Sequence, residues 1–312
     1  DTGRWNKLIR NKQYPLLNRA TQGTYAPGSI FKIVTAAAAL KEGIVNQDTR
    51  FYCPGSYKLG NRKFRCWRRG GHGWVNLHQA LVESCDVYFY NIAEKLGINR
   101  FAKYIKAFGF GNPTGIDLNE RKGVAPSREW KVTTQKKPWY IGETIVTGIG
   151  QGYISTTPLQ VSLMTASIAN GGTLLKPQIV KKVISPEGEI IIETIPDSNG
   201  HIPVDQNVAK HIMDALIGVV NDPRGTGRGS RLESMLVAGK TGTAQVISLD
   251  SKSDWNSHRD HAWFTSYVPA DNPEIAVTVI VEHGGKGGAV AAPIVRQILK
   301  AYQKLKEDGQ VG

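Results

Sequence analysis

The stretch Tyr25-Ala26-Pro27-Gly28-Ser29-Ile30-Phe31-Lys32-Ile33-Val34-Thr35, continued by alanines to Leu40, organises the rest of the sequence. Pro27 and Gly28 interrupt the preceding chain, Ser29 is a residue type that caps helices, and the alanine-rich run strongly favours a helix. We therefore predict a buried helix that begins near Ser29. On that helix Ser29 and Lys32 share a face, so the lysine amine can reach the serine hydroxyl. Burial lowers the pKa of a lysine, which predicts that Lys32 acts as a base toward Ser29.

Two further motifs support this prediction, because a serine followed by a lysine on one helix is common. Ser84-Cys85-Asp86 precedes an apolar, helix-like segment, and Lys240-Thr241-Gly242-Thr243 lies in a strand-like stretch. S-x-x-K, S-D-N and K-T-G form the signature set of penicillin-binding proteins and class A β-lactamases. The middle motif departs from that set, because Cys85 and Asp86 replace Asp and Asn.

Composition limits the function classes. The chain has 312 residues, of which 40% are hydrophobic, enough for one large domain or two lobes that share a core. A net charge of +13 and a pI near 9.6 predict an anionic partner or surface. The basic residues are scattered and no nucleic-acid-binding motif accompanies them, so we expect a cell-wall or membrane surface and no nucleic acid. The chain contains no run of 18 apolar residues and no signal peptide, and it begins at Asp1, so we expect a fragment without a membrane span.

The apolar pattern predicts the coarse secondary structure. Expected helices cover residues 77–107, 158–170, 208–220 and 291–305, expected strands cover 236–248, 262–268 and 274–282, and an expected hairpin covers 177–195. Residues 44–79 are predicted to be an irregular insertion and residues 112–142 a loop. Strands joined by short links predict an antiparallel sheet with a helix packed on it.

The sequence resembles the transpeptidase domain of class B penicillin-binding proteins, and within them the elongation-type group of penicillin-binding protein 2. Besides the three motifs, the resemblance rests on Asn18-Arg19-Ala20-Thr21-Gln22-Gly23, Thr114-Gly115-Ile116-Asp117-Leu118, Lys137-Pro138-Trp139-Tyr140, Gly150-Gln151-Gly152-Tyr153 and Glu282-x-Gly284-Gly285. It implies an α/β (α+β) fold, in which an antiparallel sheet flanked by helices lies beside a mostly helical lobe. The sheet lobe would comprise approximately residues 1–45 and 200–312 and the helical or irregular lobe approximately 46–199, without the N-terminal anchor and pedestal domain.

The resemblance also implies a function. The family's enzymes are serine-type D,D-transpeptidases that cross-link peptidoglycan stem peptides, here during cell elongation, and they are targets of β-lactam antibiotics. Expected partners of the full-length protein are a membrane glycosyltransferase and scaffold proteins of the elongation complex. The expected location is the periplasmic face of the inner membrane.

Catalytic roles follow residue by residue from the resemblance. Ser29 would attack the carbonyl of a D-alanyl-D-alanine terminus, and Lys32 would take its proton. Ser84 would relay a proton to the leaving amine, and Lys240 would keep that site positive. Asp86 replaces an amide, and as a carboxylate it is expected to order Lys32 or Lys240 by its charge.

The third motif would bind the substrate along a strand edge. The hydroxyls of Thr241 and Thr243 would bind the terminal carboxylate, and Gly242 would let the substrate backbone approach. Backbone N–H groups of Thr243 and Ser29 would form the oxyanion hole.

Four candidate ligands, Cys53, Cys66, His72 and Cys85, bracket the insertion at residues 44–79 and are separated by 12, 5 and 12 residues. Three cysteines in an extracytoplasmic protein usually form one disulfide and leave one thiol. Four soft ligands form instead a closed tetrahedral zinc site, and the residues alone leave both alternatives open. The resemblance favours structural zinc, because some penicillin-binding protein 2 homologues hold zinc with Asp, Asp, His and Cys at equivalent positions. No cofactor is needed for the chemistry itself.

Three alternative functions share the serine nucleophile. A class A β-lactamase uses a glutamate between the second and third motifs, whereas the nearest match, Glu42 to Asn46, precedes the second motif. A carboxypeptidase would use water as the acceptor, a choice that leaves no mark in the sequence. A non-catalytic β-lactam sensor would need a separate signalling domain.

Overall fold

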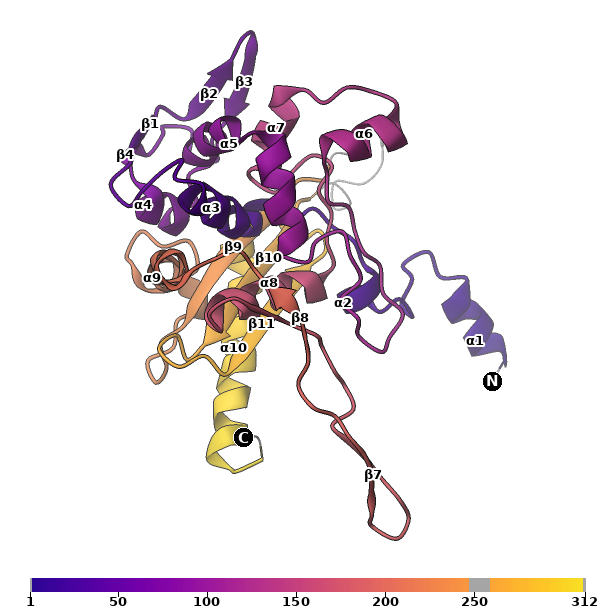
Figure 1. Ribbon diagram of the computed structural model, residues 1–312. Helices are drawn as coiled ribbons and strands as arrows, with labels where there is room; N and C mark the ends of the chain where they lie inside the picture. The colour runs from indigo at the N-terminus through magenta and orange to yellow at the C-terminus, as the bar shows by residue number, and fades with distance from the viewer. Residues whose placement is uncertain (1, 247–258, 311–312) are drawn as a thin grey trace.

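The computed structural model describes residues 2–246 and 259–310, and Figure 1 shows a mostly helical part lying over an antiparallel sheet. The helices are α1 (Thr2–Ile9), α2 (Arg19–Gln22), α3 (Lys32–Lys41), α4 (Leu77–Val82), α5 (Asp86–Ala107), α6 (Arg128–Gln135), α7 (Ile141–Thr147), α8 (Pro158–Ala169), α9 (Gln206–Asn221) and α10 (Gly287–Glu307), with 3₁₀ turns η1 (Gly28–Phe31) and η2 (Arg228–Ser230). The strands are β1 (Phe51–Cys53), β2 (Ser56–Leu59), β3 (Arg62–Arg65), β4 (Gly73–Val75), β5 (Thr173–Leu175), β6 (Lys182–Ile184), β7 (Ile190–Glu193), β8 (Ser198–His201), β9 (Ala238–Ala244), β10 (His261–Val268) and β11 (Ile275–Val281). Within the described residues, no helix is both long and apolar enough to cross a bilayer.

The main sheet has three antiparallel strands in the order β11-β10-β9. Successive side chains of a strand point to opposite faces, and β10 uses both. Phe264 and Val268 pack with α10, whereas Trp263 and Tyr267 belong to the larger core that includes α8 and α9. The predicted α+β class is confirmed: an antiparallel sheet lies between helices, beside a mostly helical part.

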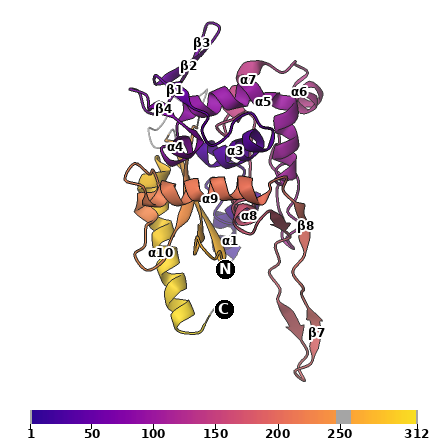
Figure 2. The same ribbon diagram turned by 60° about the vertical axis from the view of Figure 1, so that its left-hand side comes forward.

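The alanine-rich run forms the buried helix that the sequence predicts. All residues from Lys32 to Ala39 in α3 are buried, and α5 and α9 pack against the helix (Figure 2). Small side chains let these neighbours approach closely. The beginning differs from the prediction, because η1 precedes α3 and Ser29 makes no cap hydrogen bond.

Other predicted elements are confirmed at nearly their expected bounds: α8, α9, α10, and the hairpin formed by β6 and β7. The strand predicted for 236–248 is β9, and the end of that prediction lies outside the described residues. The helix predicted for 77–107 is broken twice: the turn from Glu83 to Cys85 separates α4 from α5, and Gly97, with a φ of 69° and a ψ of 155°, kinks α5.

Two segments predicted to be irregular contain regular structure. The loop prediction for 112–142 was wrong, because α6 and the start of α7 lie there. Ser127 caps α6 by accepting from Trp130 N–H at 3.0 Å, a local signal that apolar periodicity does not register. The insertion at 44–79 holds two small antiparallel pairs, β1 with β4 and β2 with β3.

Candidate active site

The turn that carries Ser29 is held in place by close backbone contacts. Gly28 has a φ of +56°, in the left-handed region that glycine adopts without strain. A Cβ at Gly28 would lie 2.5 Å from the carbonyl oxygen of Thr243, so only glycine allows β9 to come this near. The Gly28 N–H also donates to the Gly150 carbonyl at 2.9 Å. Ser29 is thereby fixed between the edge of β9 and the loop that follows α7.

Lys32 lies one helical turn beyond Ser29 and contacts the second motif. Its Nζ donates to the carbonyl oxygen of Ser84 at 2.9 Å and to the Ser84 hydroxyl at 3.1 Å. It also lies 2.7 Å from Asp86 Oδ1 in a buried ion pair. Throughout residues 2–246 and 259–310, the Ser29 hydroxyl has no hydrogen-bond partner. In the resting site Lys32 is therefore engaged by Ser84 and Asp86, and the Ser29 hydroxyl is free to meet a substrate.

Lys240 reaches the same hydroxyl from the other side. Its Nζ lies 3.0 Å from Ser84 Oγ, and its side chain is completely buried. Burial lowers the pKa of Lys240 well below the usual lysine value, and the nearby charge of Lys32 lowers it further, while Asp86 opposes the change. Lys240 thus loses its proton more readily than an exposed lysine. The Ser84 hydroxyl links an ion-paired ammonium to an amine that can accept a proton.

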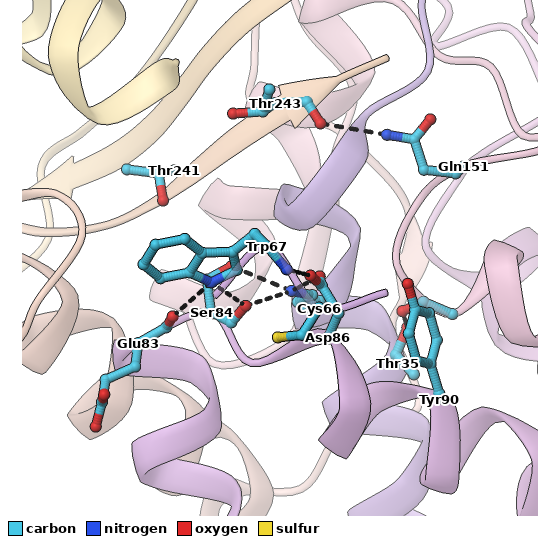
Figure 3. A network of polar contacts seen from close by, with 12 residues as sticks. Thr35, Cys66, Trp67, Glu83, Ser84, Asp86, Tyr90, Gln151, Thr241 and Thr243 are labelled. Carbon is cyan, nitrogen blue, oxygen red and sulfur yellow. Dashed lines mark hydrogen bonds and ion pairs between the residues drawn. The ribbon is translucent and has the colours of Figure 1, made fainter. Parts of the chain in front are cut away.

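Ser84 occupies an unusual backbone conformation that its neighbours maintain. Its φ is +55°, a value rare for residues other than glycine. The Trp67 indole N–H donates to the carbonyls of Ser84 at 3.0 Å and Glu83 at 3.1 Å, and the Trp67 backbone N–H donates to Asp86 Oδ2 at 2.8 Å (Figure 3). Trp67 was not predicted as a site residue, because its only signal in the sequence is its position beside Cys66.

The edge of β9 borders a cleft of about 850 Å³ that Ser29, Ser84 and Trp67 also line. Thr241 Oγ1 lies 2.8 Å from Thr226 Oγ1, and the carbonyl of Thr243 accepts from Gln151 Nε2 at 3.2 Å (Figure 3). Gly242 packs so tightly on Pro27 and Ile30 that an added Cβ would lie 2.9 Å from each. The predicted motif residues therefore line one cleft, except for Lys32 and Lys240, which are buried and contact Ser84. Gln151 and Thr226 were not predicted as site residues.

The four candidate metal ligands also come together. Cys53, Cys66, His72 and Cys85 offer ligand atoms that all lie within 4.8 Å of one another. Sulfurs bound tetrahedrally to zinc at about 2.3 Å are about 3.8 Å apart, which this spacing accommodates. His72 Nδ1 lies 3.6 Å from Cys53 Sγ and 3.5 Å from Cys66 Sγ.

Two observations concern the chemical state of these cysteines. All three are free in the structure, and no disulfide joins any two of them. A hydrogen bond from Cys85 lowers the pKa of the Cys66 thiol, which favours the thiolate that a metal binds. The donor set therefore fits a closed zinc site. The cluster is adjacent to the turn that carries Ser84, because Cys66 precedes Trp67 and Cys85 follows Ser84.

Comparisons with known proteins give a consistent result. The model of the penicillin binding protein transpeptidase domain matches residues 2–300. The peptidoglycan D,D-transpeptidase MrdA of Haemophilus influenzae is 40% identical, over 96% of this chain and 47% of that relative. The structure of Pseudomonas aeruginosa PBP2 in complex with WCK 5153 has a TM-score of 0.85 and 39% identity, over 97% of this chain and 64% of that chain. The Helicobacter pylori PBP2 in complex with MreC has a TM-score of 0.84 and 33% identity, over 100% of this chain and 55% of that chain.

The chain spans about half the length of the curated relatives that it matches. The family match, in contrast, extends over nearly the whole chain. This chain belongs to the penicillin-binding protein transpeptidase domain family.

Proposed function

We propose that this chain catalyses D,D-transpeptidation: it joins a stem peptide that ends in D-alanyl-D-alanine to an amine of a neighbouring peptide during cell elongation. One observation carries the proposal. Ser84 Oγ lies 3.1 Å from Lys32 Nζ and 3.0 Å from Lys240 Nζ, on the cleft that contains Ser29. Acyl transfer needs a nucleophile, a base and a proton donor for the leaving group within reach of one another.

Acylation begins when the Ser29 oxygen attacks the carbonyl carbon of the penultimate D-alanine and its proton passes to Lys32. For this step Lys32 must be unprotonated, and in the structure its Nζ forms an ion pair with Asp86. Lys240 can offer a neutral amine for that proton, because burial lowers its pKa and so favours its unprotonated form. A proton can move from Lys32 through the Ser84 hydroxyl to a neutral Lys240. Lys240 then carries the positive charge that its expected role beside Ser84 requires.

The bond between the carbonyl carbon and the nitrogen of the last D-alanine then breaks. That nitrogen takes a proton through Ser84, and D-alanine leaves. The backbone N–H groups of Ser29 and Thr243 would bind the developing oxyanion, and the Thr241 and Thr243 hydroxyls would bind the terminal carboxylate. An acceptor amine finally attacks the ester and releases the Ser29 hydroxyl.

The lining of the cleft argues against the hydrolytic mechanism of a class A β-lactamase, which uses a glutamate to activate water. Among the described residues, no glutamate lines this cleft. Asp86 does line the cleft beside Ser84, but its carboxylate is ion-paired with Lys32.

Mass spectrometry of the protein after exposure to benzylpenicillin tests the proposal. We expect one stable adduct on the peptide that contains Ser29. With a synthetic peptide ending in D-alanyl-D-alanine and an amine acceptor, we expect D-alanine release and an amide product. An adduct on another residue, or none, would refute the nucleophile. A short-lived adduct would indicate a β-lactamase, hydrolysed peptide alone a carboxypeptidase, and an adduct without D-alanine release a sensor.

We further propose that the full-length protein works on the periplasmic face of the inner membrane, where peptidoglycan stem peptides are found. The net charge of +13 suits a polyanionic wall or an anionic membrane surface. The matched PBP2 of Helicobacter pylori forms a complex with MreC, which supports a scaffold protein as one partner. A membrane glycosyltransferase that supplies glycan strands is the second partner that we propose.

We propose that Cys53, Cys66, His72 and Cys85 hold a structural zinc ion. Four protein ligands leave no open coordination position, so the ion would supply folding energy and no chemistry. The ion would also hold the turn that carries Ser84 in place, because it would link Cys85 in that turn to Cys66, the residue before Trp67. Elemental analysis of protein purified without chelator is expected to find one equivalent of zinc, and less than about half an equivalent would contradict a site of this affinity.

Trp67→Phe is expected to slow acylation by benzylpenicillin about three- to tenfold, the worth of one or two hydrogen bonds. Phenylalanine keeps an aromatic wall but removes the indole N–H that supports the Ser84 carbonyl. Trp74→Phe is the matched control, because Trp74 is similarly exposed on β4. The measurement is the acylation rate at unchanged zinc content. Equal rates in both variants would show that the indole N–H does not position Ser84.

A further inference from the structure

Gln151 lies on a loop that is fixed to the nucleophile turn. The carbonyl of Gly150 accepts from Gly28 N–H at 2.9 Å, and Gly150, at a φ of +72°, lies so near the Gly28 carbonyl that a Cβ would collide with it. The backbone N–H of Gln151 donates to Val146 at the end of α7 at 3.0 Å. The position of the Gln151 side chain is therefore set by the same contacts that set Ser29.

From this loop the Gln151 carboxamide reaches the edge of the main sheet. Its Nε2 donates to the carbonyl of Thr243 at 3.2 Å (Figure 3). Within the described residues β9 is an edge strand with β10 on its other side, and this carbonyl accepts from a side chain that lies outside the sheet. A backbone acceptor at a strand edge that no neighbouring strand uses is the kind of group to which an added peptide strand binds.

The ligand group that needs this acceptor follows from antiparallel pairing. Two residues in a hydrogen-bonded pair exchange both of their N–H···O bonds. A ligand residue whose carbonyl accepts the Thr243 N–H therefore donates its own N–H to the Thr243 carbonyl. In the proposed reaction that residue is the one that Ser29 attacks. The N–H in question is the amide of the penultimate D-alanine, or the acylamino N–H beside the β-lactam carbonyl of a penicillin.

We propose that the Gln151 carboxamide occupies, in the free enzyme, the position of this ligand N–H, and that it must leave the Thr243 carbonyl when an acylamino ligand binds. The inference rests on the proposed function, because it takes Ser29 as the nucleophile and Thr243 N–H as an oxyanion donor. Gln151 is then a specificity residue. Ligands with an N–H next to the reactive carbonyl compete with it, and ligands without one do not.

Gln151→Met tests this competition, because methionine has a similar length and no N–H. The probes are benzylpenicillin, which has the acylamino N–H, and imipenem, which carries a hydroxyethyl group at that position. The quantity measured is the dissociation constant of the complex that precedes acylation. We expect this constant to fall about two- to tenfold for benzylpenicillin, the worth of one hydrogen bond that no longer needs to be broken. For imipenem we expect no comparable fall, so the ratio of the two constants changes.

Gln178→Met is the matched control, because the Gln178 amide also donates to a backbone carbonyl, that of Ile195, but on the distant hairpin. It should leave both constants unchanged. Equal shifts for the two drugs in Gln151→Met, or weaker benzylpenicillin binding, would overturn the inference. If that variant does not fold by circular dichroism, Gln151→Asn, whose shorter amide cannot reach Thr243 in the same way, takes its place with the same expected ratio. Failure of the proposed function is distinct, because it would appear as a wild-type protein that neither drug acylates at Ser29.

Discussion

Lys32→Met is expected to slow acylation of Ser29 by benzylpenicillin about 10³-fold, within the range that a positioned general base contributes. The substitution removes the group that we propose takes the serine proton, and it leaves the Ser84 carbonyl and Asp86 without their shared lysine partner. The measurement is the rate of fluorescent penicillin labelling, with Ser29→Ala as the zero of the assay.

Stability and chemistry can be separated with two further variants. Lys131 is the matched control, because it is also buried and ion-paired, with Glu143, but does not line the cleft. Lys131→Met should lower the melting temperature yet be labelled at close to the wild-type rate. In Lys32→Met/Asp86→Asn the unpaired carboxylate is removed, so thermal stability should recover while acylation stays slow. Labelling of Lys32→Met within tenfold of wild type would contradict its role as the base.

His72→Ala is expected to release zinc and lower the melting temperature by at least about 10 °C, because metal-binding free energy in such a site is folding free energy. His72 Nδ1 lies against the sulfurs of Cys53 and Cys66, and a methyl group cannot replace it. Acylation should slow as well, since the turn of Ser84 is then attached less firmly to the segment of Trp67. The measurements are zinc content, thermal unfolding and penicillin labelling on the same preparation.

His78→Ala provides the control for this second prediction. His78 is an exposed histidine on α4, near the insertion but outside the ligand cluster. It should keep its zinc and its melting temperature. A His72→Ala protein with full zinc content and unchanged unfolding would show that the cluster does not hold the ion.

The sequence was sufficient to find the residues whose chemistry is local. The order of three motifs brought Ser29, Ser84 and Lys240 into one prediction, and the alanine run predicted the buried α3. The sequence could not show which charged side chains form ion pairs with one another. That Asp86 pairs with Lys32 and not Lys240 depends on how α3 packs against the start of α5.

Residues whose contacts form only when distant segments of the chain pack together could not be identified from the sequence. Trp67 donates across 17 positions to Ser84, and Gln151 donates across 92 positions to Thr243. Contacts over such separations follow no helix or strand period, so the sequence pattern cannot reveal them. The missed helices α6 and α7 have the same explanation at shorter range, because capping side chains at Ser127 and Glu143 define them more than apolar spacing does.

A single oxygen, Ser84 Oγ, touches both lysines. In the proposed reaction, microscopic reversibility requires the incoming amine to give up its proton along the route by which the departing amine was protonated. Each turnover would then return the site to its starting ionisation without exchange with bulk solvent. An inhibitor that rotates this one oxygen away would stall both halves of the cycle at once.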